Sequence, residues 1–266
     1  MKQNIHIQIA DPAGNITIFV LDRFQRNQYQ HIASNLLDMK ELKAEQVAFV
    51  TGENSMEMCG LEFCGNASRA FALLLAKKRG LHGDALVNVS VSGSEERLTV
   101  AVNADKNYTR IKMPLPVSVE TWEHDGTPLP PHCQAVDFGG ILHIILKDEI
   151  PSRERFDQIR DYVYSLADPP ALGVMFYDTA KNLMTPVVYV KDVNTTYFEG
   201  SCGSGSTAAA AAFCAEEGDG TFQFTLSQPA GVITASVEKR NGVIDAVYIE
   251  GPVSLGSVME VTVETD

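Results

Sequence analysis

The segment Glu62-Phe63-Cys64-Gly65-Asn66-Ala67-Ser68 has a distant counterpart in Gly200-Ser201-Cys202-Gly203-Ser204-Gly205-Ser206. In each segment one cysteine precedes a glycine and a small polar residue, and a stretch of small and apolar residues follows. The first stretch runs to Gly80 and the second to Gly218, and glycine favours the left-handed conformation in which many helices end. The sequence therefore predicts two cysteines that each lie at the N-terminus of a helix.

Such a position has a chemical consequence for a thiol. The first N–H groups of a helix have no partner within the helix, and the macrodipole places partial positive charge there. The pKa of a cysteine can fall at such a site from about 8.5 to roughly 3.5–7.5. The same N–H groups can hold a carboxylate. If the two helices meet end-on around one anion, Cys64 and Cys202 would act on opposite faces of it, one removing a proton and the other delivering one.

Simpler explanations exist for each half of this pattern. One cysteine beside a helix start is usually a packing residue, and it is the second copy that favours a function. A zinc site would need Cys-x-x-Cys or His-x-x-x-His spacing, which the sequence lacks, and Cys59 lies five residues before Cys64. The Gly203–Ser206 stretch has no following lysine, so it does not match a phosphate-binding loop. We therefore predict no metal site and no phosphate loop.

Composition limits the class of protein. The chain has 266 residues, a formal net charge of −13 and 45% hydrophobic residues, which is enough for one large or two ordinary domains with a real core. Strong negative charge argues against binding to nucleic acid or to an anionic membrane. No apolar run approaches the length of a membrane span. Five cysteines without regular spacing fit a cytoplasmic protein with free thiols.

The predicted elements follow the same order in two halves. The first half has strands at 4–10, 16–21 and 46–50, a helix at 28–40, the first cysteine helix, and strands at 86–91, 97–103 and 108–113. A proline-rich stretch at 114–131 has no periodic pattern and marks a boundary. The second half has strands at 133–138, 141–147, 173–178 and 183–190, a helix at 153–167, the second cysteine helix, and strands at 221–227, 232–238 and 243–249.

This duplicated order predicts an α+β fold of two pseudo-symmetric domains. Each domain would be a mostly antiparallel sheet or barrel wrapped around a central helix. The N-terminal domain would span 1–115 and carry Cys64, and the C-terminal domain would span 116–255 and carry Cys202. A last strand at 258–263, within the segment 256–266, would return to the first domain. The active cleft would then lie between the two domains.

The motifs Cys64-Gly65-Asn66 and Cys202-Gly203-Ser204-Gly205 resemble the paired active-site motifs of the diaminopimelate epimerase superfamily. These enzymes are cofactor-independent racemases and epimerases that use two thiols. The resemblance covers almost the whole chain and implies that Cys64 and Cys202 are the acid/base pair. It also implies that Asn15, Gln46, Gly65, Asn66, Gly203 and Ser204 contact the substrate. The residues themselves favour a turn role for Asn15 and a core role for His143.

Departures from the diaminopimelate epimerase pattern bear on the substrate. Here Gly139-Gly140-Ile141-Leu142-His143 lacks the family's asparagine, and Tyr197-Phe198-Glu199-Gly200-Ser201 lacks its arginine before the second cysteine. Those side chains recognise the remote end of diaminopimelate in that family. A second carboxylate would therefore lack its charge partner in this chain.

A closer resemblance is to the histidine racemases of opine metallophore pathways, in Pro12–Thr17, Glu45–Val47 and Gln228–Gly231 as well as in both cysteine motifs. The predicted function is therefore racemisation of L- and D-histidine without a cofactor. The alternatives are a diaminopimelate epimerase, a racemase of another amino acid with one carboxylate, or a non-catalytic amino-acid-binding or thiol-redox module. Exchange of the α-proton with solvent separates the last alternative from the others. The expected partner is a small amino acid, with neither nucleic acid nor membrane, and a homodimer is compatible with the sequence.

Overall fold

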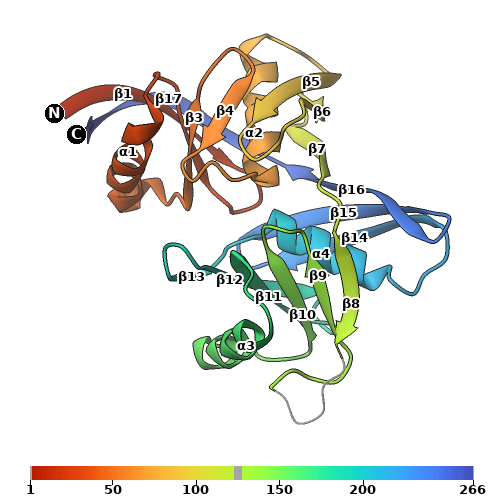
Figure 1. Ribbon diagram of the computed structural model, residues 1–266. Helices are drawn as coiled ribbons and strands as arrows, with labels where there is room; N and C mark the ends of the chain where they lie inside the picture. The colour runs from red at the N-terminus through yellow and green to blue at the C-terminus, as the bar shows by residue number, and fades with distance from the viewer. Residues whose placement is uncertain (1, 123–127, 266) are drawn as a thin grey trace. The chain divides into compact units, whose positions relative to one another are not determined.

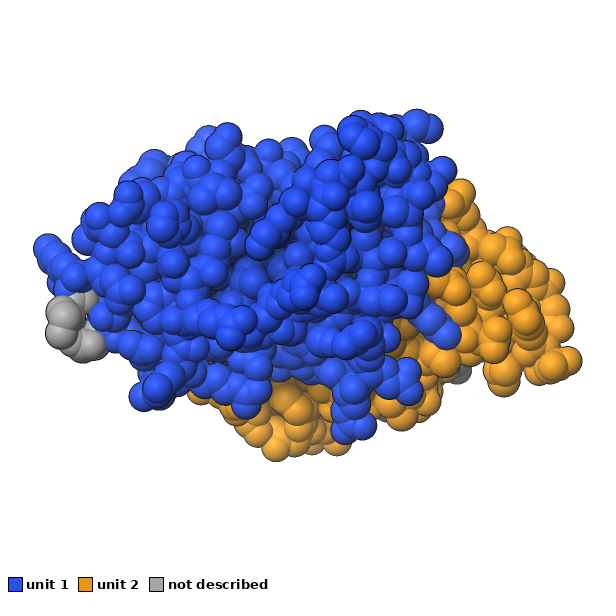
Figure 2. Space-filling model, turned by 90° about the horizontal axis from the view of Figure 1, so that it is seen from above, with its two compact units in different colours: residues 1–112, 250–266 blue, residues 113–249 orange. Residues whose placement is uncertain are grey.

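The computed structural model describes residues 2–122 and 128–265. The chain divides into two compact units, one formed by Met1–Lys112 with Glu250–Asp266 and the other by Met113–Ile249 (Figure 2). We refer to them as unit 1 and unit 2 and describe each by itself. Both are dominated by strands, as the sequence predicted for an α+β fold (Figure 1).

The strands of unit 1 pair in the order β17–β1–β2–β3–β4–β5–β6–β7. Two of these pairs, β2–β3 and β4–β5, are parallel, and the others are antiparallel. Parallel neighbours need a long crossover connection, which α1 (Arg26–Asp38) and α2 (Gly65–Lys78) provide. The strands are β1 (Lys2–Asp11), β2 (Thr17–Val20), β3 (Gln46–Val50), β4 (Ser55–Met58), β5 (Asp84–Val91), β6 (Leu98–Asn103), β7 (Tyr108–Met113) and β17 (Ser254–Glu264), and the short 3-10 helix η1 (Lys40–Leu42) follows α1.

Unit 2 pairs its strands in the order β8–β9–β10–β11–β12, and β12 also pairs with β13 and β14, which is followed by β15. Its parallel pairs are β10–β11 and β12–β14. The crossovers contain α3 (Arg153–Leu166) and α4 (Gly203–Phe213). The strands are β8 (Ser118–Trp122), β9 (Cys133–Asp137), β10 (Leu142–Lys147), β11 (Ala171–Asp178), β12 (Leu183–Val190), β13 (Thr195–Phe198), β14 (Gly220–Gln228) and β15 (Gly231–Arg240), and β16 (Val243–Pro252) continues from unit 2 into unit 1.

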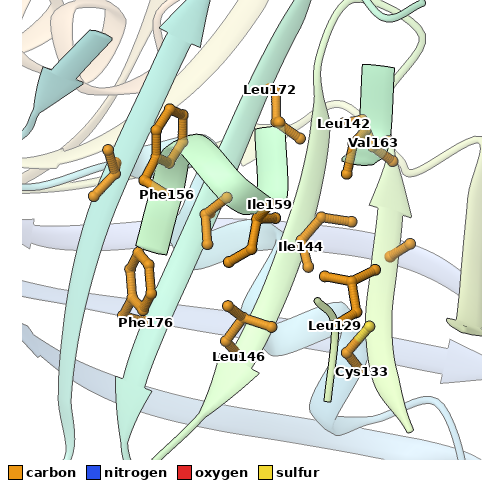
Figure 3. Close-up of a cluster of buried hydrophobic side chains, with 13 residues drawn as sticks. Leu129, Cys133, Leu142, Ile144, Leu146, Phe156, Ile159, Val163, Leu172 and Phe176 are labelled. Atoms are coloured by element: carbon orange, nitrogen blue, oxygen red, sulfur yellow. The ribbon is translucent and has the colours of Figure 1, made fainter. Parts of the chain in front are cut away.

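The two cysteine helices are buried on every side. All residues of α2 from Gly65 to Ala76 are buried, and in α4 all residues from Gly203 to Ala212 except Ser204 are buried. A helix that is small and apolar all round is stable only in an interior. By contrast, α3 buries one face, on which Phe156, Ile159 and Val163 pack against side chains of β10 and β11 (Figure 3). The cysteines therefore lie at the ends of the most enclosed helices of the chain that the structure describes.

Three short strands and one helix end differ from the sequence-based expectations. Strands β4, β8 and β13 were not predicted, and β8 lies within the proline-rich stretch, of which 123–127 fall outside the described residues. The left-handed cap at Gly80 is confirmed, with φ of 64°. The cap predicted at Gly218 is wrong, because α4 ends at Phe213 and Cys214 is its C-cap. The ammonium of Lys239 instead donates to the carbonyls of Cys214 and Ala215, at 2.9 and 3.1 Å, which satisfies that helix end.

Among the helices of the two described ranges, none combines the length and the apolar character that crossing a membrane requires.

Candidate active site

Cys64 is the N-cap residue of α2. Its backbone is extended, with φ of −127° and ψ of 111°, and its Sγ accepts a hydrogen bond from the N–H of Ala67 at 3.4 Å. This is the bond that a serine or aspartate oxygen makes in an ordinary cap. The hydroxyl of Ser68 donates to the carbonyl of Cys64 at 2.7 Å and fixes that peptide. The helix therefore directs one of its free N–H groups at the sulfur.

Asn15, Gln46 and Asn66, which the family resemblance assigns to substrate binding, come together beside Cys64. The Oδ1 atom of Asn15 accepts from Nε2 of Gln46 at 2.8 Å and from Nδ2 of Asn66 at 3.4 Å. Both amide atoms of Gln46 lie 3.5 Å from the Sγ atom of Cys64. Three amide side chains from distant parts of unit 1 thus form one network that includes the thiol.

The role that the residues alone favoured for Asn15 is not the one in the structure. The turn after β1 is held by Asp11, whose carboxylate accepts from the N–H of Gly14, and by the left-handed Ala13 and Gly14. The side chain of Asn15 is buried, and its Nδ2 donates to the Glu45 carboxylate at 2.8 Å. Asn15 is therefore a member of the thiol network and not a turn-forming side chain.

The chain that leads to Cys64 is fixed by the turn after β5. Gly93 has φ of 70°, and a Cβ atom there would clash with the backbone of Phe63. The hydroxyl of Ser92 donates to the carbonyl of Glu62 at 2.8 Å and accepts from the N–H of Met58 at 2.8 Å. Burial raises the pKa of the Glu62 carboxyl. The 59–63 segment is thus held by close backbone contact as well as by hydrogen bonds.

Cys202 has the corresponding position at the start of α4. Its backbone has φ of −130° and ψ of 117°, and its Sγ accepts from the N–H of Gly205 at 3.3 Å. The Oε1 atom of Gln228 accepts from the N–H of Cys202 at 2.8 Å, and the Nε2 atom of the same glutamine donates to the hydroxyl of Ser206 at 2.9 Å. The two caps match in backbone conformation and in the third-residue N–H that reaches the sulfur.

A hydroxyl and an imidazole lie next to the Cys202 sulfur. The Oγ atom of Ser204 is 3.4 Å from Sγ of Cys202 and 3.1 Å from Nε2 of His143. His143 is fully buried, and burial lowers its pKa to about 3, so the ring is neutral at pH 7. Its Nδ1 has no hydrogen-bond partner among the described residues. Since an orphaned N–H is rarer than an orphaned acceptor, the favoured tautomer carries its proton on Nε2 and donates to Ser204.

A glycine makes room for this imidazole. His143 on β10 is in register with Gly173 on the parallel strand β11. A Cβ atom at Gly173 would collide with Nδ1 of His143 and lie 2.6 Å from its Cε1. The sequence suggested a core role for His143, and the structure places it in the core and also in contact with Ser204.

The electrostatic environment of Cys202 opposes the one expected from its helix. Burial raises the pKa of the Cys202 thiol well above its ordinary value, and the charge of Glu199 raises it further. The hydrogen bonds from Ser204 and from the N–H of Gly205 act in the other direction but are weaker. The expectation that the helix end lowers this pKa is therefore wrong for Cys202, because the residue is only 7% exposed and its thiolate would carry the cost of desolvation.

The predicted site residues form two groups, one in each unit. Cys64, Asn15, Gln46 and Asn66 are joined by hydrogen bonds in unit 1, where Gly65 is the first residue of α2. Cys202 and Ser204 are in contact in unit 2, where Gly203 is the first residue of α4. Three further members of these groups were given no site role from the sequence: Arg69, Gln228, and Thr17, whose hydroxyl accepts from Nε2 of Gln46 at 2.8 Å. Thr17 and Gln228 lie in segments that carry the family resemblance, and Arg69 follows Cys64 by five residues in the same helix.

No group of three or more His, Cys, Asp or Glu side chains in the described part of the chain has the geometry to hold a metal ion. All five cysteines are thiols in the structure.

Comparison with known proteins places these features in a family. The family described as "Histidine racemase CntK N-terminal domain" matches residues 4–260. The chain is 34% identical over 264 residues to a histidine racemase of Fusobacterium nucleatum, covering 94% of this chain and 95% of that protein. It is 24% identical to a histidine racemase of Staphylococcus aureus, with 90% of each chain covered.

A hydroxyproline epimerase from Agrobacterium vitis has a similar fold, with a TM-score of 0.64 at 9% identity, over 97% of this chain and 92% of that chain. At this identity the similarity supports the fold alone. The family match and the Fusobacterium relative, by contrast, extend over nearly the whole sequence. This chain belongs to the histidine racemase family.

Proposed function

We propose that this protein interconverts L- and D-histidine by means of two thiols, Cys64 and Cys202, without a cofactor. The observation that carries the proposal is that both cysteines are N-caps of buried helices and that both accept the N–H of the third residue that follows. Two unrelated packing cysteines would have no reason to share this geometry.

The proposal includes a two-domain, diaminopimelate epimerase-like fold in which units 1 and 2 are related by pseudo-symmetry. Its support is the order of strand pairing. In unit 1 an antiparallel group ends at β2, a parallel step crosses by α1 to β3–β4, and a second parallel step crosses by α2 to β5. In unit 2 the same order runs through β10, α3, β11–β12, α4 and β14. Each cysteine begins the helix of the second parallel crossover.

The chemistry requires a base and an acid on opposite faces of the α-carbon. One thiolate removes the α-proton and becomes a thiol, and the other thiol delivers its proton to the opposite face and becomes a thiolate. Because the α-proton is weakly acidic, the carboxylate must be stabilised as charge builds on it, and the N–H groups at the starts of α2 and α4 are suited to that task. The amides of Asn15, Gln46 and Asn66 are proposed to bind the substrate beside Cys64, with Ser204 beside Cys202.

The environments of the two sulfurs suggest their resting states. Burial and Glu199 favour the protonated form of Cys202. The half-buried Cys64 receives a backbone N–H and lies beside the amide of Gln46. We assign Cys202 as the thiol and Cys64 as the base in the enzyme that first meets a substrate. After one turnover the protonation states are exchanged.

Glu199 supports histidine over an amino acid with two carboxylates. Its charge acts on the Cys202 sulfur, so a second substrate carboxylate placed near that end of unit 2 would be repelled. An imidazole would accept or donate a hydrogen bond there without that penalty.

The proposed location of the protein is the cytoplasm, where its five thiols stay reduced. Light scattering distinguishes a monomer from a homodimer.

The direct test is exchange of the α-proton. L-histidine incubated with the protein in D₂O should lose its α-proton signal in the NMR spectrum while D-histidine accumulates to half of the total, since the two enantiomers have equal energy. Heat-treated protein is the control. Binding of histidine without exchange would instead support a non-catalytic amino-acid-binding module.

A further inference from the structure

Arg69 is a fully buried cation that forms no ion pair with a carboxylate of the described residues. Its side chain has no exposed surface, and no described Asp or Glu forms an ion pair with it. Its Nε donates to Oδ1 of Asn66 at 3.1 Å, and its Nη1 donates to the carbonyl of Gly251 at 3.0 Å and to that of Pro252 at 3.3 Å. Burying an unneutralised guanidinium is costly. Because Arg69 follows Cys64 by only five residues, we ask whether its buried charge acts on the Cys64 thiol.

The guanidinium determines the orientation of Asn66. An amide side chain can exchange its oxygen and nitrogen by a flip, but a guanidinium has donors only. The Asn66 atom that faces Arg69 must therefore be Oδ1, and Nδ2 must point to the other side. There Nδ2 lies 3.4 Å from Asn15, so the Asn15 atom at that contact must be the acceptor Oδ1.

The same logic fixes the rest of the network. With Oδ1 of Asn15 as acceptor, the Gln46 atom 2.8 Å from it must be the donor Nε2. The remaining Asn15 atom, Nδ2, then donates to the Glu45 carboxylate at 2.8 Å, which is an acceptor only. A donor-only group and an acceptor-only group thus end a chain of three amides, and only one arrangement of those amides satisfies both ends. In that arrangement Nε2 of Gln46 donates its two protons to Asn15 and to the hydroxyl of Thr17, each at 2.8 Å, and this fixed nitrogen lies 3.5 Å from the Cys64 sulfur.

The positive charge of Arg69 also acts on Cys64, in addition to the effect of its guanidinium on the amide orientations. Burial lowers the pKa of Arg69 to about 10, and the charge of Cys64, followed by those of Tyr108 and Asp11, opposes the lowering. Arg69 is therefore protonated at pH 7. An attraction that keeps the guanidinium protonated stabilises the Cys64 thiolate by the same free energy, since the coupling between two sites is reciprocal. Other acidic groups near this pair are Tyr108 and Asp11, which act on Arg69, and Glu45, which accepts from Asn15.

We infer that Arg69 is a positioning residue of the active site, which orients the amides of Asn66, Asn15 and Gln46 and supplies the positive charge that faces Cys64. This inference rests on the proposed function. In it, Arg69 does not touch the Cys64 sulfur, but it sets the orientation of the amides that bind the substrate and favours the thiolate form of Cys64. A purely structural cation would affect stability alone.

The chain offers a matched control in Lys239, the other buried cation among the described residues. Lys239 is 6% exposed, and its ammonium donates to the carbonyls of Cys214, Ala215 and Glu217 at the C-terminal end of α4. Lys239→Met removes a buried cation without touching the amide network. Arg69→Gln removes both the positive charge and the planar set of guanidinium N–H donors. Arg69→Lys keeps the charge but loses the planar set of donors.

Two measurements test the inference. The first is steady-state kinetics with L-histidine, for which Arg69→Gln should raise KM and lower kcat/KM by about 100-fold, the loss that a misplacement of about 1 Å causes. The second is alkylation of Cys64 by iodoacetamide as a function of pH, followed by peptide mass spectrometry with Cys59 as the internal standard. Its midpoint should move to higher pH in Arg69→Gln. Arg69→Lys should keep the midpoint near that of the wild type while KM stays raised.

The outcomes are separable. An unchanged KM and alkylation profile in Arg69→Gln, or equal changes in Lys239→Met, would overturn the inference. If Arg69→Gln does not fold, Arg69→Lys tests the inference instead. A shifted midpoint of Cys64 alkylation with an unchanged KM in Arg69→Lys would be the opposite of the expected pattern and would overturn the inference. If the wild type itself fails to exchange the α-proton of histidine, the proposed function fails, while the alkylation measurement still tests Arg69.

Discussion

The hydroxyl of Ser204 lies 3.1 Å from Nε2 of His143, a ring that is completely buried and neutral. With the proton on Nε2, the imidazole donates to Ser204, and the serine proton is left to point at the Cys202 sulfur 3.4 Å away. The neutral His143 ring therefore fixes the direction of the hydrogen bond from Ser204 to Cys202, although the ring itself makes no hydrogen bond to the thiol.

Ser204→Ala should therefore slow racemisation by roughly 10-fold, the effect of one hydrogen bond to a charged group. The loss raises the pKa of Cys202, because the Ser204 hydrogen bond lowers it. Since the two enantiomers have equal energy, kcat/KM must fall equally from L- and from D-histidine. Ser204→Thr keeps the hydroxyl and is the control, and a wild-type rate in Ser204→Ala would contradict the assigned contact.

Gly173→Ala should displace the imidazole, since the new Cβ atom would lie 2.6 Å from Cε1 of His143. Overpacking of this kind costs about 1–3 kcal/mol of stability, and kcat/KM should fall with it because Ser204 loses its partner. The matched control is Gly140→Ala, where a Cβ atom meets nothing within 4 Å. Thermal unfolding and histidine kinetics measure the two effects. Equal behaviour of the two variants would rule out the steric argument.

Cys64→Ser and Cys202→Ser should each abolish racemisation, because a serine hydroxyl is a far weaker base than a thiolate at neutral pH. Cys133 and Cys214 are 4% and 0% exposed and pack in the interior of unit 2, where a serine hydroxyl would be buried. Alanine is therefore the better control at these two positions, and it should lower the melting temperature while leaving kcat/KM near that of the wild type. The assay is formation of D-histidine, and full turnover by either active-site variant would exclude the two-thiol mechanism.

Glu199→Gln should shift the pH dependence of the reaction. The charge of Glu199 raises the pKa of Cys202, so its removal lowers that pKa. The enzyme form with Cys202 as thiol then persists over a narrower range, and the alkaline limb of the kcat/KM profile should move to lower pH. The same variant should discriminate less between histidine and diaminopimelate, compared side by side by α-proton exchange in D₂O. A faster exchange of diaminopimelate than of histidine by the wild type would reverse the substrate assignment.

Local patterns in the sequence predicted the elements that depend on local interactions. The helix that follows Cys64 ends where Gly80 adopts a left-handed conformation, and a single glycine is sufficient to signal that. The end of α4 was mispredicted because the carbonyls of its C-cap Cys214 and of the residues that follow are bound by Lys239, which lies 25 residues beyond Cys214. Strands β4 and β13 have four residues each, too few to show an alternating pattern.

The candidate site likewise has features that local sequence motifs indicated and features that depend on distant residues. The motifs around the two cysteines indicated which side chains to examine, and the structure brings Asn15, Gln46 and Asn66 to Cys64. The desolvation of Cys202 could not be predicted, because it depends on how the whole unit packs around the start of α4. Likewise, the contact of Arg69 with Gly251 joins residues 182 positions apart, a separation at which no local pattern operates.

The near-complete enclosure of α2 and α4 limits which substitutions could change the substrate preference of this enzyme. Since nearly every position on these helices faces a packed interior, a substitution there would disturb the fold before it altered selectivity. The segment that precedes Cys202 in the sequence is different, because Tyr197 and Phe198 on β13 are about half exposed, at 47% and 50%. Directed evolution of substrate preference should therefore accumulate changes in the 195–199 segment and leave the two helices untouched.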